Sequence, residues 1–263
     1  MTGPRVARWR AARPVLIAVA TLMAVVAVIL VAVGGPATDD PDQIRTAVVY
    51  PPEVGPPPKG HGLSDDLVAQ LSGSTVGIRG LDCLRAQVGS GFVVDGGLIV
   101  TSAHVVAGIS SPVVTVNGDE IATRVVGFDP VADLAVLVTV DDQSMPEPLS
   151  LGDAVAGSVG AILVHEDMGP RAIPMVIARR IRAIGADVYG RAADGRDALI
   201  LAATVVGGHS GAAVVDEKGR VVGITFSRIR GGASVAYAVQ SSALQTLLER
   251  VRVSPEPAGP CVE

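Results

Sequence analysis

The sequence predicts an all-β domain, a barrel or a sandwich, between residues 64 and 252. Most of this region consists of short runs rich in Val, Ile and Ala, which Gly, Asp-Gly or Asn-Gly pairs interrupt, as in "GSGFVVDGG", "PVVTVNGDE" and "RVVGITFS". Many short strands with regular turn signals are typical of both architectures. Two helices frame the strands: one follows the cap residue Ser64 in "DDLVAQL", and the other begins at Ser241 in "SSALQTLLERV".

An apolar run without any charged residue, Val15 to Val33, precedes this domain. At about 1.5 Å per residue it roughly matches the hydrocarbon core of a bilayer, so we expect a transmembrane helix over 15–33. The alternative is a cleaved signal peptide, although its apolar region would be longer than usual. Either interpretation exports the rest of the chain, and the positive-inside rule makes residues 1–14 a cytoplasmic tail because of four arginines, Arg5, Arg8, Arg10 and Arg13.

Two further segments lie outside the predicted domain. Residues 34–63 are expected to form a Pro-rich, semi-rigid linker, because seven prolines fall between Gly34 and Gly60. Residues 253–263 form a short C-terminal tail. Without the four N-terminal arginines the chain carries 17 basic and 26 acidic residues, a formal charge of −9. This charge argues against nucleic acid or an anionic surface as the main partner of the exported part.

Both cysteines, Cys83 and Cys261, fall on the predicted exported side. In an oxidising compartment we expect one disulfide that ties the C-terminal tail to the start of the domain. The alternative is a pair of free, buried thiols.

The segment "VVGGHSGAAVV" around Ser210 fits two kinds of enzyme. A nucleophile elbow of an α/β-hydrolase requires a helix directly after the serine and a catalytic histidine later in the chain. No histidine follows Ser210, and the next residues, "GAAVVDEKGRVVGITFS", have the pattern of a hairpin. The elbow interpretation therefore fails.

A protease of the trypsin-like kind requires His, Asp and Ser in that order, each on a loop of a β-barrel. "LIVTSAHVV" places His104 just after a predicted strand, "DPVADLAVL" places Asp133 just before one, and "GGHSG" encloses Ser210 between glycines. These segments resemble the trypsin-like serine proteases of the HtrA-like branch. Two further features are shared: the stretch "DVYG", and a cysteine expected just before the first barrel, Cys83, with its partner near the C-terminus, Cys261. With these, the segments are most similar to the membrane-anchored, extracytoplasmic proteases of actinobacteria linked to acid resistance in mycobacteria.

The resemblance covers residues 64–261 and implies two six-stranded antiparallel β-barrels. It implies His104 as general base, Asp133 as the group that orients the imidazole, and Ser210 as nucleophile. The backbone N–H groups of Gly208 and Ser210 would form the oxyanion hole. The implied function is a single-pass, extracytoplasmic serine endopeptidase that needs no cofactor and cleaves protein or peptide substrates of the cell envelope. Unlike that type, which has several membrane spans, this chain shows one.

The nucleophile segment "GHSGAA" departs from the family pattern, which has Asp or Asn before the serine and Gly-Pro after the following glycine. His209 has three interpretations: a neutral residue that holds the loop, a pH sensor, or a mark of decay to an inactive enzyme. If the backbone at Ala212 needs a positive φ, alanine is strained there. The alternative function is therefore a catalytically inactive module of the same fold that binds peptides or an envelope partner.

The other histidines are assigned no catalytic role. His61 belongs to the linker, and we expect His165 to be a surface loop residue. A metal site from His104, His165 and His209 has no spacing signature. The segments expected to form the substrate pocket, "ATVV", "GITFS" and "SVAYAVQ", contain no acid, which predicts cleavage after a small or medium apolar residue. The sequence does not indicate an oligomeric state.

Overall fold

The computed structural model describes residues 53–141, 143–228, 234–251 and 258–262. The predicted cytoplasmic tail, membrane helix and most of the Pro-rich linker lie outside these residues. Within the described part of the chain, no helix is long and apolar enough to cross a membrane.

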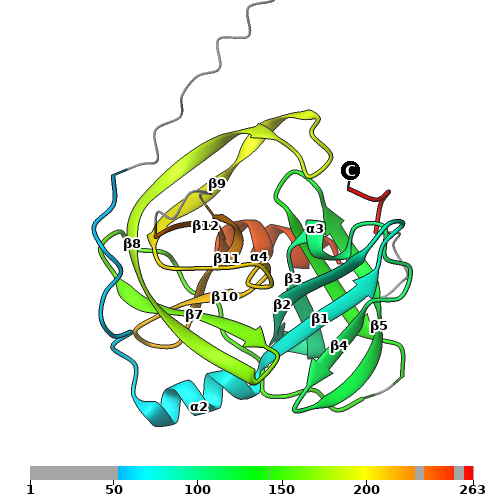
Figure 1. The fold of residues 1–263 in the computed structure, drawn as a ribbon, viewed down its shortest axis with the longest axis horizontal. Helices are drawn as coiled ribbons and strands as arrows, with labels where there is room; N and C mark the ends of the chain where they lie inside the picture. The colour runs from blue at the N-terminus through cyan, green and yellow to red at the C-terminus, as the bar shows by residue number, and fades with distance from the viewer. Residues whose placement is uncertain (1–52, 142, 229–233, 252–257, 263) are drawn as a thin grey trace, which may run out of the picture. The chain divides into compact units, whose positions relative to one another are not determined.

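Six antiparallel strands close into the first barrel, in the order β1-β2-β3-β6-β5-β4 (Figure 1). The barrel closes because β1 pairs with β4 as well as with β2. Its strands are β1 (Thr75–Leu81), β2 (Ala86–Val94), β3 (Leu98–Thr101), β4 (Val113–Val116), β5 (Asp119–Asp129) and β6 (Leu134–Thr139). The turn between β2 and β3, Asp95–Gly97, places Gly96 and Gly97 at φ 78° and 69°, as the predicted Asp-Gly turn requires.

The second barrel has the same strand order in the second half of the chain, β10-β11-β12-β9-β8-β7, and closes through pairing of β7 with β10. Its strands are β7 (Val159–Glu166), β8 (Gly169–Ala186), β9 (Ala192–Ala202), β10 (Ala213–Asp216), β11 (Val221–Arg228) and β12 (Val235–Gln240). The predicted all-β fold is confirmed, as is the predicted hairpin after Ser210.

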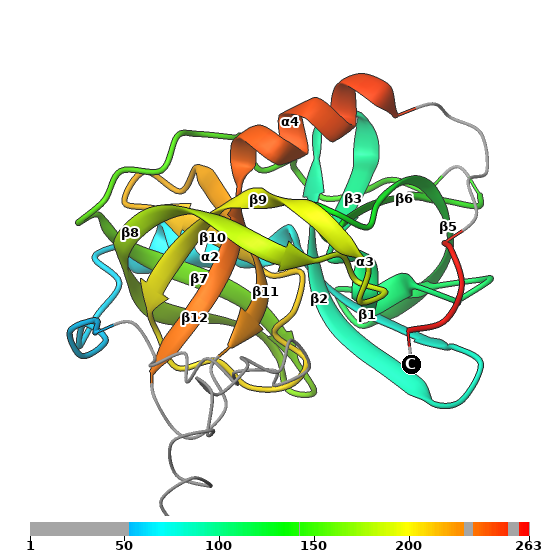
Figure 2. The ribbon, with the colours of Figure 1, turned by 90° about the horizontal axis from the view of Figure 1, so that it is seen from above.

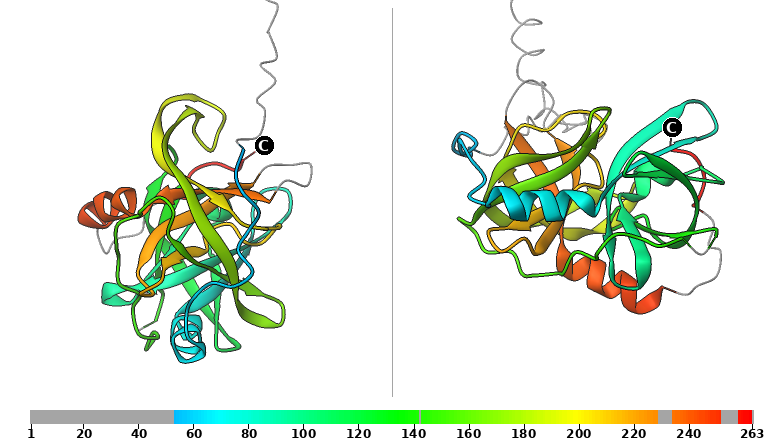
Figure 3. Two further views of the ribbon diagram at one scale, coloured as in Figure 1. Left: turned by 90° about the vertical axis from the view of Figure 1, so that its left-hand side faces the viewer. Right: turned by 90° about the horizontal axis from the view of Figure 1, so that it is seen from below.

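Within the residues that the structure describes, three α-helices accompany the barrels (Figures 2 and 3). Helix α2 (Asp65–Gly73) begins after Ser64, whose hydroxyl accepts a hydrogen bond from the Leu67 N–H at 3.3 Å. Helix α4 (Ser241–Arg250) buries Leu244 and Leu247 and lies along both barrels. Helix α3 (Ala103–Val106) is a single turn shortly after the end of β3. The two helices predicted from sequence are therefore present.

The strands at the junction of the barrels are buried on both faces, which explains their nearly continuous apolar sequences. In β7, Ile162 and Val164 point into the second barrel, whereas Ala161 and Leu163 belong to the cluster that joins the two barrels. In β6, Ala135 faces the interior of the first barrel and its neighbours face the same joining cluster. The strands nearest the functional site are thus fixed from two sides.

Strands β8 and β9 form a hairpin that reaches beyond the second barrel to the first (Figure 1). Near its tip, the Val188 N–H donates to the Pro130 carbonyl at 3.0 Å. The Tyr189 hydroxyl donates to the Ala258 carbonyl at 3.4 Å, in the C-terminal tail. This hairpin therefore bridges the two barrels beside the segment that carries Asp133.

Candidate active site

His104 lies on α3, directly after β3 ends at Thr101. The close approach of β2 to this helix depends on glycine. A Cβ atom on Gly89 would lie 2.6 Å from Cγ1 of Val105 and 3.1 Å from the carbonyl oxygen of Ser210. Gly89, the first glycine of "GSG", therefore allows the histidine helix and the serine loop to pack against the same strand.

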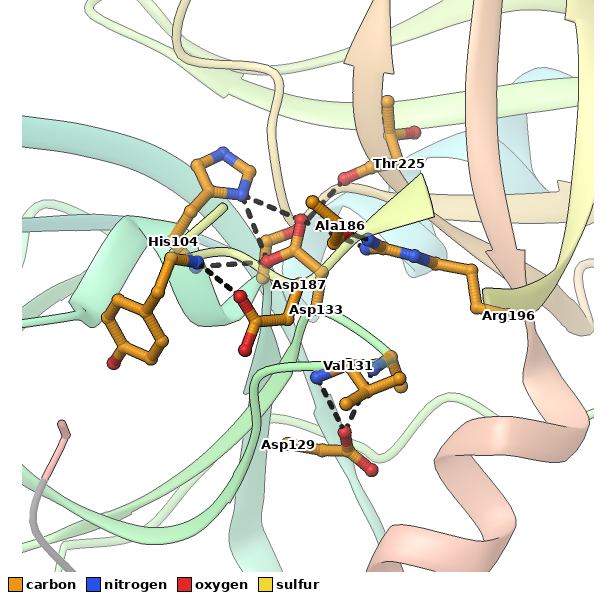
Figure 4. Close-up of polar contacts among 11 residues, drawn as sticks. His104, Asp129, Val131, Asp133, Ala186, Asp187, Arg196 and Thr225 are labelled. Carbon is orange, nitrogen blue, oxygen red and sulfur yellow. Dashed lines mark hydrogen bonds and ion pairs between the residues drawn. The ribbon is translucent and has the colours of Figure 1, made fainter. Parts of the chain in front are cut away.

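Asp133 lies immediately before β6, and its carboxylate faces His104 (Figure 4). Its side chain keeps 5% of its exposure and receives three contacts from His104: the backbone N–H at 3.0 Å and Nδ1 at 3.1 and 2.9 Å from the two carboxylate oxygens. The turn before it is closed by Asp129, which accepts the N–H groups of Val131 and Ala132. Asp133 itself has φ 59°, a strained conformation for a residue with a side chain.

These contacts fix both the tautomer and the basicity of His104. With the carboxylate at Nδ1, the proton of neutral imidazole lies on Nδ1 and Nε2 is the acceptor. Burial lowers the pKa of His104, but the charge and hydrogen bond of Asp133 raise it further, so the pKa lies above its ordinary value. The imidazole keeps 31% of its exposure and can still reach a substrate.

Ser210 lies in the loop between β9 and β10, where glycine is needed on both sides. Gly208 has φ 88° and Gly211 has φ 85°. A Cβ atom on Gly211 would lie 2.2 Å from the carbonyl oxygen of Ser90, so this position excludes any side chain. Among the described residues, the backbone N–H groups of Gly208 and Ser210 donate to no other group of the protein.

Ser90, a fully buried residue of β2, holds this loop at two points. Its backbone N–H donates to the Ser210 carbonyl at 2.8 Å, and its hydroxyl donates to the Gly208 carbonyl at 2.9 Å. The same hydroxyl accepts the N–H of His165 at 3.0 Å. Sequence reasoning noted the glycines of "GSG" but missed the serine between them.

One carbonyl, that of Thr225 on β11, joins the histidine and serine segments. It accepts the hydroxyl of Ser102 at 3.1 Å, which precedes α3, and the N–H of Gly211 at 2.7 Å. Within the described part of the chain, no hydrogen bond joins the His104 imidazole to the Ser210 hydroxyl. The structure thus pairs His104 with Asp133 directly and brings Ser210 to them through shared backbone anchors.

His209 is buried, with 2% of its surface exposed, and fixes the loop before Ser210. Its Nδ1 accepts the Val206 N–H at 3.2 Å, so Nε2 carries the proton and lies 3.0 Å from Oε1 of Glu166. Arg171 pairs with the same carboxylate. The hydrogen bond to Arg171, with that to His209, holds the pKa of Glu166 below its ordinary value despite some desolvation. Ala212 does not have a positive φ, so the strain considered for alanine there is absent.

Two expectations about other residues were wrong. His165 is not a surface loop residue: it belongs to β7, and a Cβ atom on Gly77 of the first barrel would lie 2.8 Å from its Nδ1. Burial there lowers the pKa of His165. Cys83 does not precede the first barrel but lies in the turn between β1 and β2. It forms the expected disulfide with Cys261, with 6.1 Å between the Cα atoms.

Two closed six-stranded barrels pack against each other, and the segments that carry His104, Asp133 and Ser210 meet where the barrels join. The protein-family model described as "Trypsin-like peptidase domain" matches residues 89–224, just over half of the chain. The chain therefore belongs to the trypsin-like peptidases.

Its relatives include serine proteases of bacteria. The serine protease Rv3671c of Mycobacterium tuberculosis is 29% identical over 205 residues, which span 76% of this chain and 52% of that protein. A probable periplasmic serine endoprotease, DegP-like, of Bartonella henselae is 31% identical over 172 residues, 62% of this chain and 33% of that protein. The chain thus spans about half of the first relative and a third of the second.

Solved structures give the same relationship. The active form of the Rv3671c protease aligns with a TM-score of 0.73 at 29% identity, covering 82% of this chain and 100% of that chain. The HtrA-type protease AlgW with a tripeptide aligns with a TM-score of 0.60 at 24% identity, covering 70% of this chain and 62% of that chain, and shares the fold.

Proposed function

We propose that the protein is a serine endopeptidase in which Ser210 attacks the scissile carbonyl of a peptide. His104 takes the serine proton at Nε2 and later gives it to the leaving amine, while Asp133 holds the Nδ1 proton and stabilises the imidazolium. The observation that carries this proposal is the pairing of His104 with the buried carboxylate of Asp133, in a segment that shares the Thr225 carbonyl with the serine loop.

The oxyanion of the tetrahedral intermediate would lie against the N–H groups of Gly208 and Ser210. Donors that are already oriented and not used inside the protein need no rearrangement when negative charge develops on the substrate oxygen. Collapse of the intermediate expels the amine and leaves an acyl group on Ser210. A water molecule, deprotonated by His104, then releases the acid product.

The first test is labelling of the purified domain, residues 53–263, with a fluorophosphonate probe between pH 5 and 8. We expect labelling that disappears in the Ser210→Ala variant. Absence of labelling in a domain shown to be folded and oxidised would support the inactive binding module instead. Cleavage of esters without cleavage of a peptide library would indicate an esterase that uses the same residues.

The substrate pocket is proposed to take a small or medium apolar residue. Two of its expected walls adjoin: the Ala203 N–H donates to the Ser234 carbonyl, and the hydroxyls of Thr204 and Ser234 lie 3.0 Å apart. These groups are neutral, so they provide no counter-charge for a basic side chain. A peptide library cleaved mainly after Arg or Lys would overturn this assignment.

We also propose that residues 15–33 anchor the enzyme with the protease domain outside the cytoplasm. The support is the uncharged apolar run and the arginines before it. Fractionation of cells that express the full chain, with and without residues 1–33, tests the anchor. Protein of mature, shortened length in the soluble exported fraction would favour a cleaved signal peptide.

A further inference from the structure

A largely covered arginine of the second barrel lies near the carboxylate of Asp133. Arg196 lies on β9, opposite Ala183 of β8, and its side chain keeps 13% of its exposure. Its Nη1 lies 3.8 Å from Oδ2 of Asp133, the oxygen that is also 2.9 Å from Nδ1 of His104. Figure 4 shows the two side chains approaching Asp133 from different elements.

Two other contacts fix the guanidinium group of Arg196. Its Nη2 donates to the Ala186 carbonyl at 2.9 Å, near the end of β8. Its Cζ lies 4.9 Å from the centre of the Phe226 ring, a cation–π distance. The group is therefore held by the hairpin and by β11, and its charge has little freedom to move away from Asp133.

The position has an electrostatic consequence for the pair. The side chain of Asp133 is only 5% exposed. Burial of a charged carboxylate costs free energy unless cations and hydrogen-bond donors surround it. His104 supplies donors on one side, and Arg196 supplies a permanent positive charge from the other barrel. The charged groups that act on the imidazole are Asp133, which raises the pKa of His104, and Arg196, which lowers it.

We propose that Arg196 is a positioning residue of the active site: from the second barrel it holds the Asp133 carboxylate in the orientation that receives the Nδ1 proton of His104. This inference rests on the proposed function of His104, Asp133 and Ser210. Arg196 does not touch the substrate. It acts through Asp133, so its removal changes the rate and the pH profile of the reaction rather than substrate binding.

The surroundings of Arg196 permit substitution. A cavity of about 390 Å³ borders it, lined also by Arg182 of β8 and Arg250 of α4. Arg196→Met keeps the apolar stem over Phe226 and removes the charge, whereas Arg196→Lys keeps a charge. Arg182 is the matched control, because it lines the same cavity and pairs with Asp197, and its side chain is 52% exposed.

The experiment measures the limiting rate of fluorophosphonate labelling and the probe concentration for half-maximal rate, from pH 5 to 9, in the oxidised domain. We expect Arg196→Met to lower the limiting rate roughly tenfold, as a displaced catalytic group would. The half-maximal concentration should not change, and the acid limb of the profile should move to higher pH. Arg196→Lys should restore part of the rate, and Arg182→Met should match the wild type.

A second measurement separates this inference from the proposed function. The imidazole of His104 is titrated by NMR in the Ser210→Ala background, with and without the Arg196→Met substitution, so no catalytic turnover is needed. A higher pKa of His104 without Arg196 supports the inference even if the wild type is not labelled. Unchanged titration and labelling in a folded Arg196→Met variant, or equal losses in Arg182→Met, would overturn it.

Discussion

Replacement of His209 by alanine tests whether this residue holds the nucleophile loop. The change removes the acceptor of the Val206 N–H, a loss of about 1 kcal/mol. It also empties the space of a buried imidazole, which adds about 1 to 2 kcal/mol. Together they should lower the free energy of unfolding by about 2 to 3 kcal/mol.

The assay is urea unfolding of the oxidised domain, beside fluorophosphonate labelling. Because the ring bonds to both Val206 and Glu166 fix the backbone before Ser210, His209→Ala should lose roughly tenfold or more in labelling rate.

Two conservative variants divide the role between the ring nitrogens. His209→Asn keeps an acceptor near Val206 but does not reach Glu166, whereas His209→Gln keeps a donor for Glu166 only. We expect both to fall between the wild type and alanine in stability and labelling. If His209→Ala unfolds at the wild-type urea concentration and reacts at the wild-type rate, the loop does not depend on His209 and the reasoning is refuted.

Three further outcomes follow from the structure. Because the pKa of His104 is raised on folding, its contribution to stability is present below its unfolded pKa and is lost as pH rises through the folded pKa. In urea titrations from pH 5 to 9, the stability of the wild type relative to His104→Ala should therefore fall as pH rises. A pH-independent difference would contradict this. Gly211→Ala should abolish labelling, because the added Cβ meets the Ser90 carbonyl; a fully labelled variant would disprove the close contact. Cys261→Ser should lower stability by roughly 2 to 4 kcal/mol in thermal unfolding, and an unchanged melting temperature would show that the disulfide contributes nothing.

Local patterns predicted the parts of the site that depend on short stretches of chain. His104 follows a strand and Asp133 precedes one. The ends of strands can be predicted from sequence because apolar runs and turn residues mark them. The order of the histidine, aspartate and serine segments excluded the α/β-hydrolase. The sequence also shows glycines around Ser210, and the structure explains them, because the loop has positive φ at Gly208 and Gly211.

Partners brought together by the closing of the barrels could not be predicted. Glu166 meets His209 across 43 residues, and Arg196 meets Asp133 from the other barrel. The sequence around Glu166 and Arg196 does not distinguish them from solvent-exposed charged residues, because their contacts depend on strand register. His165 was misplaced because β7 continues through Glu166 to pair with Gly169, so its ring lies between the barrels.

The shared carbonyl of Thr225 couples assembly of the protein to its chemistry. The histidine segment is held through Ser102 and the serine loop through Gly211, and the acceptor between them belongs to the second barrel. Under the proposed roles, the first barrel alone would have the base and the carboxylate but no nucleophile, and the second barrel alone would have the serine without the base. In the proposed mechanism, the catalytic groups are therefore complete only after both barrels have docked on each other.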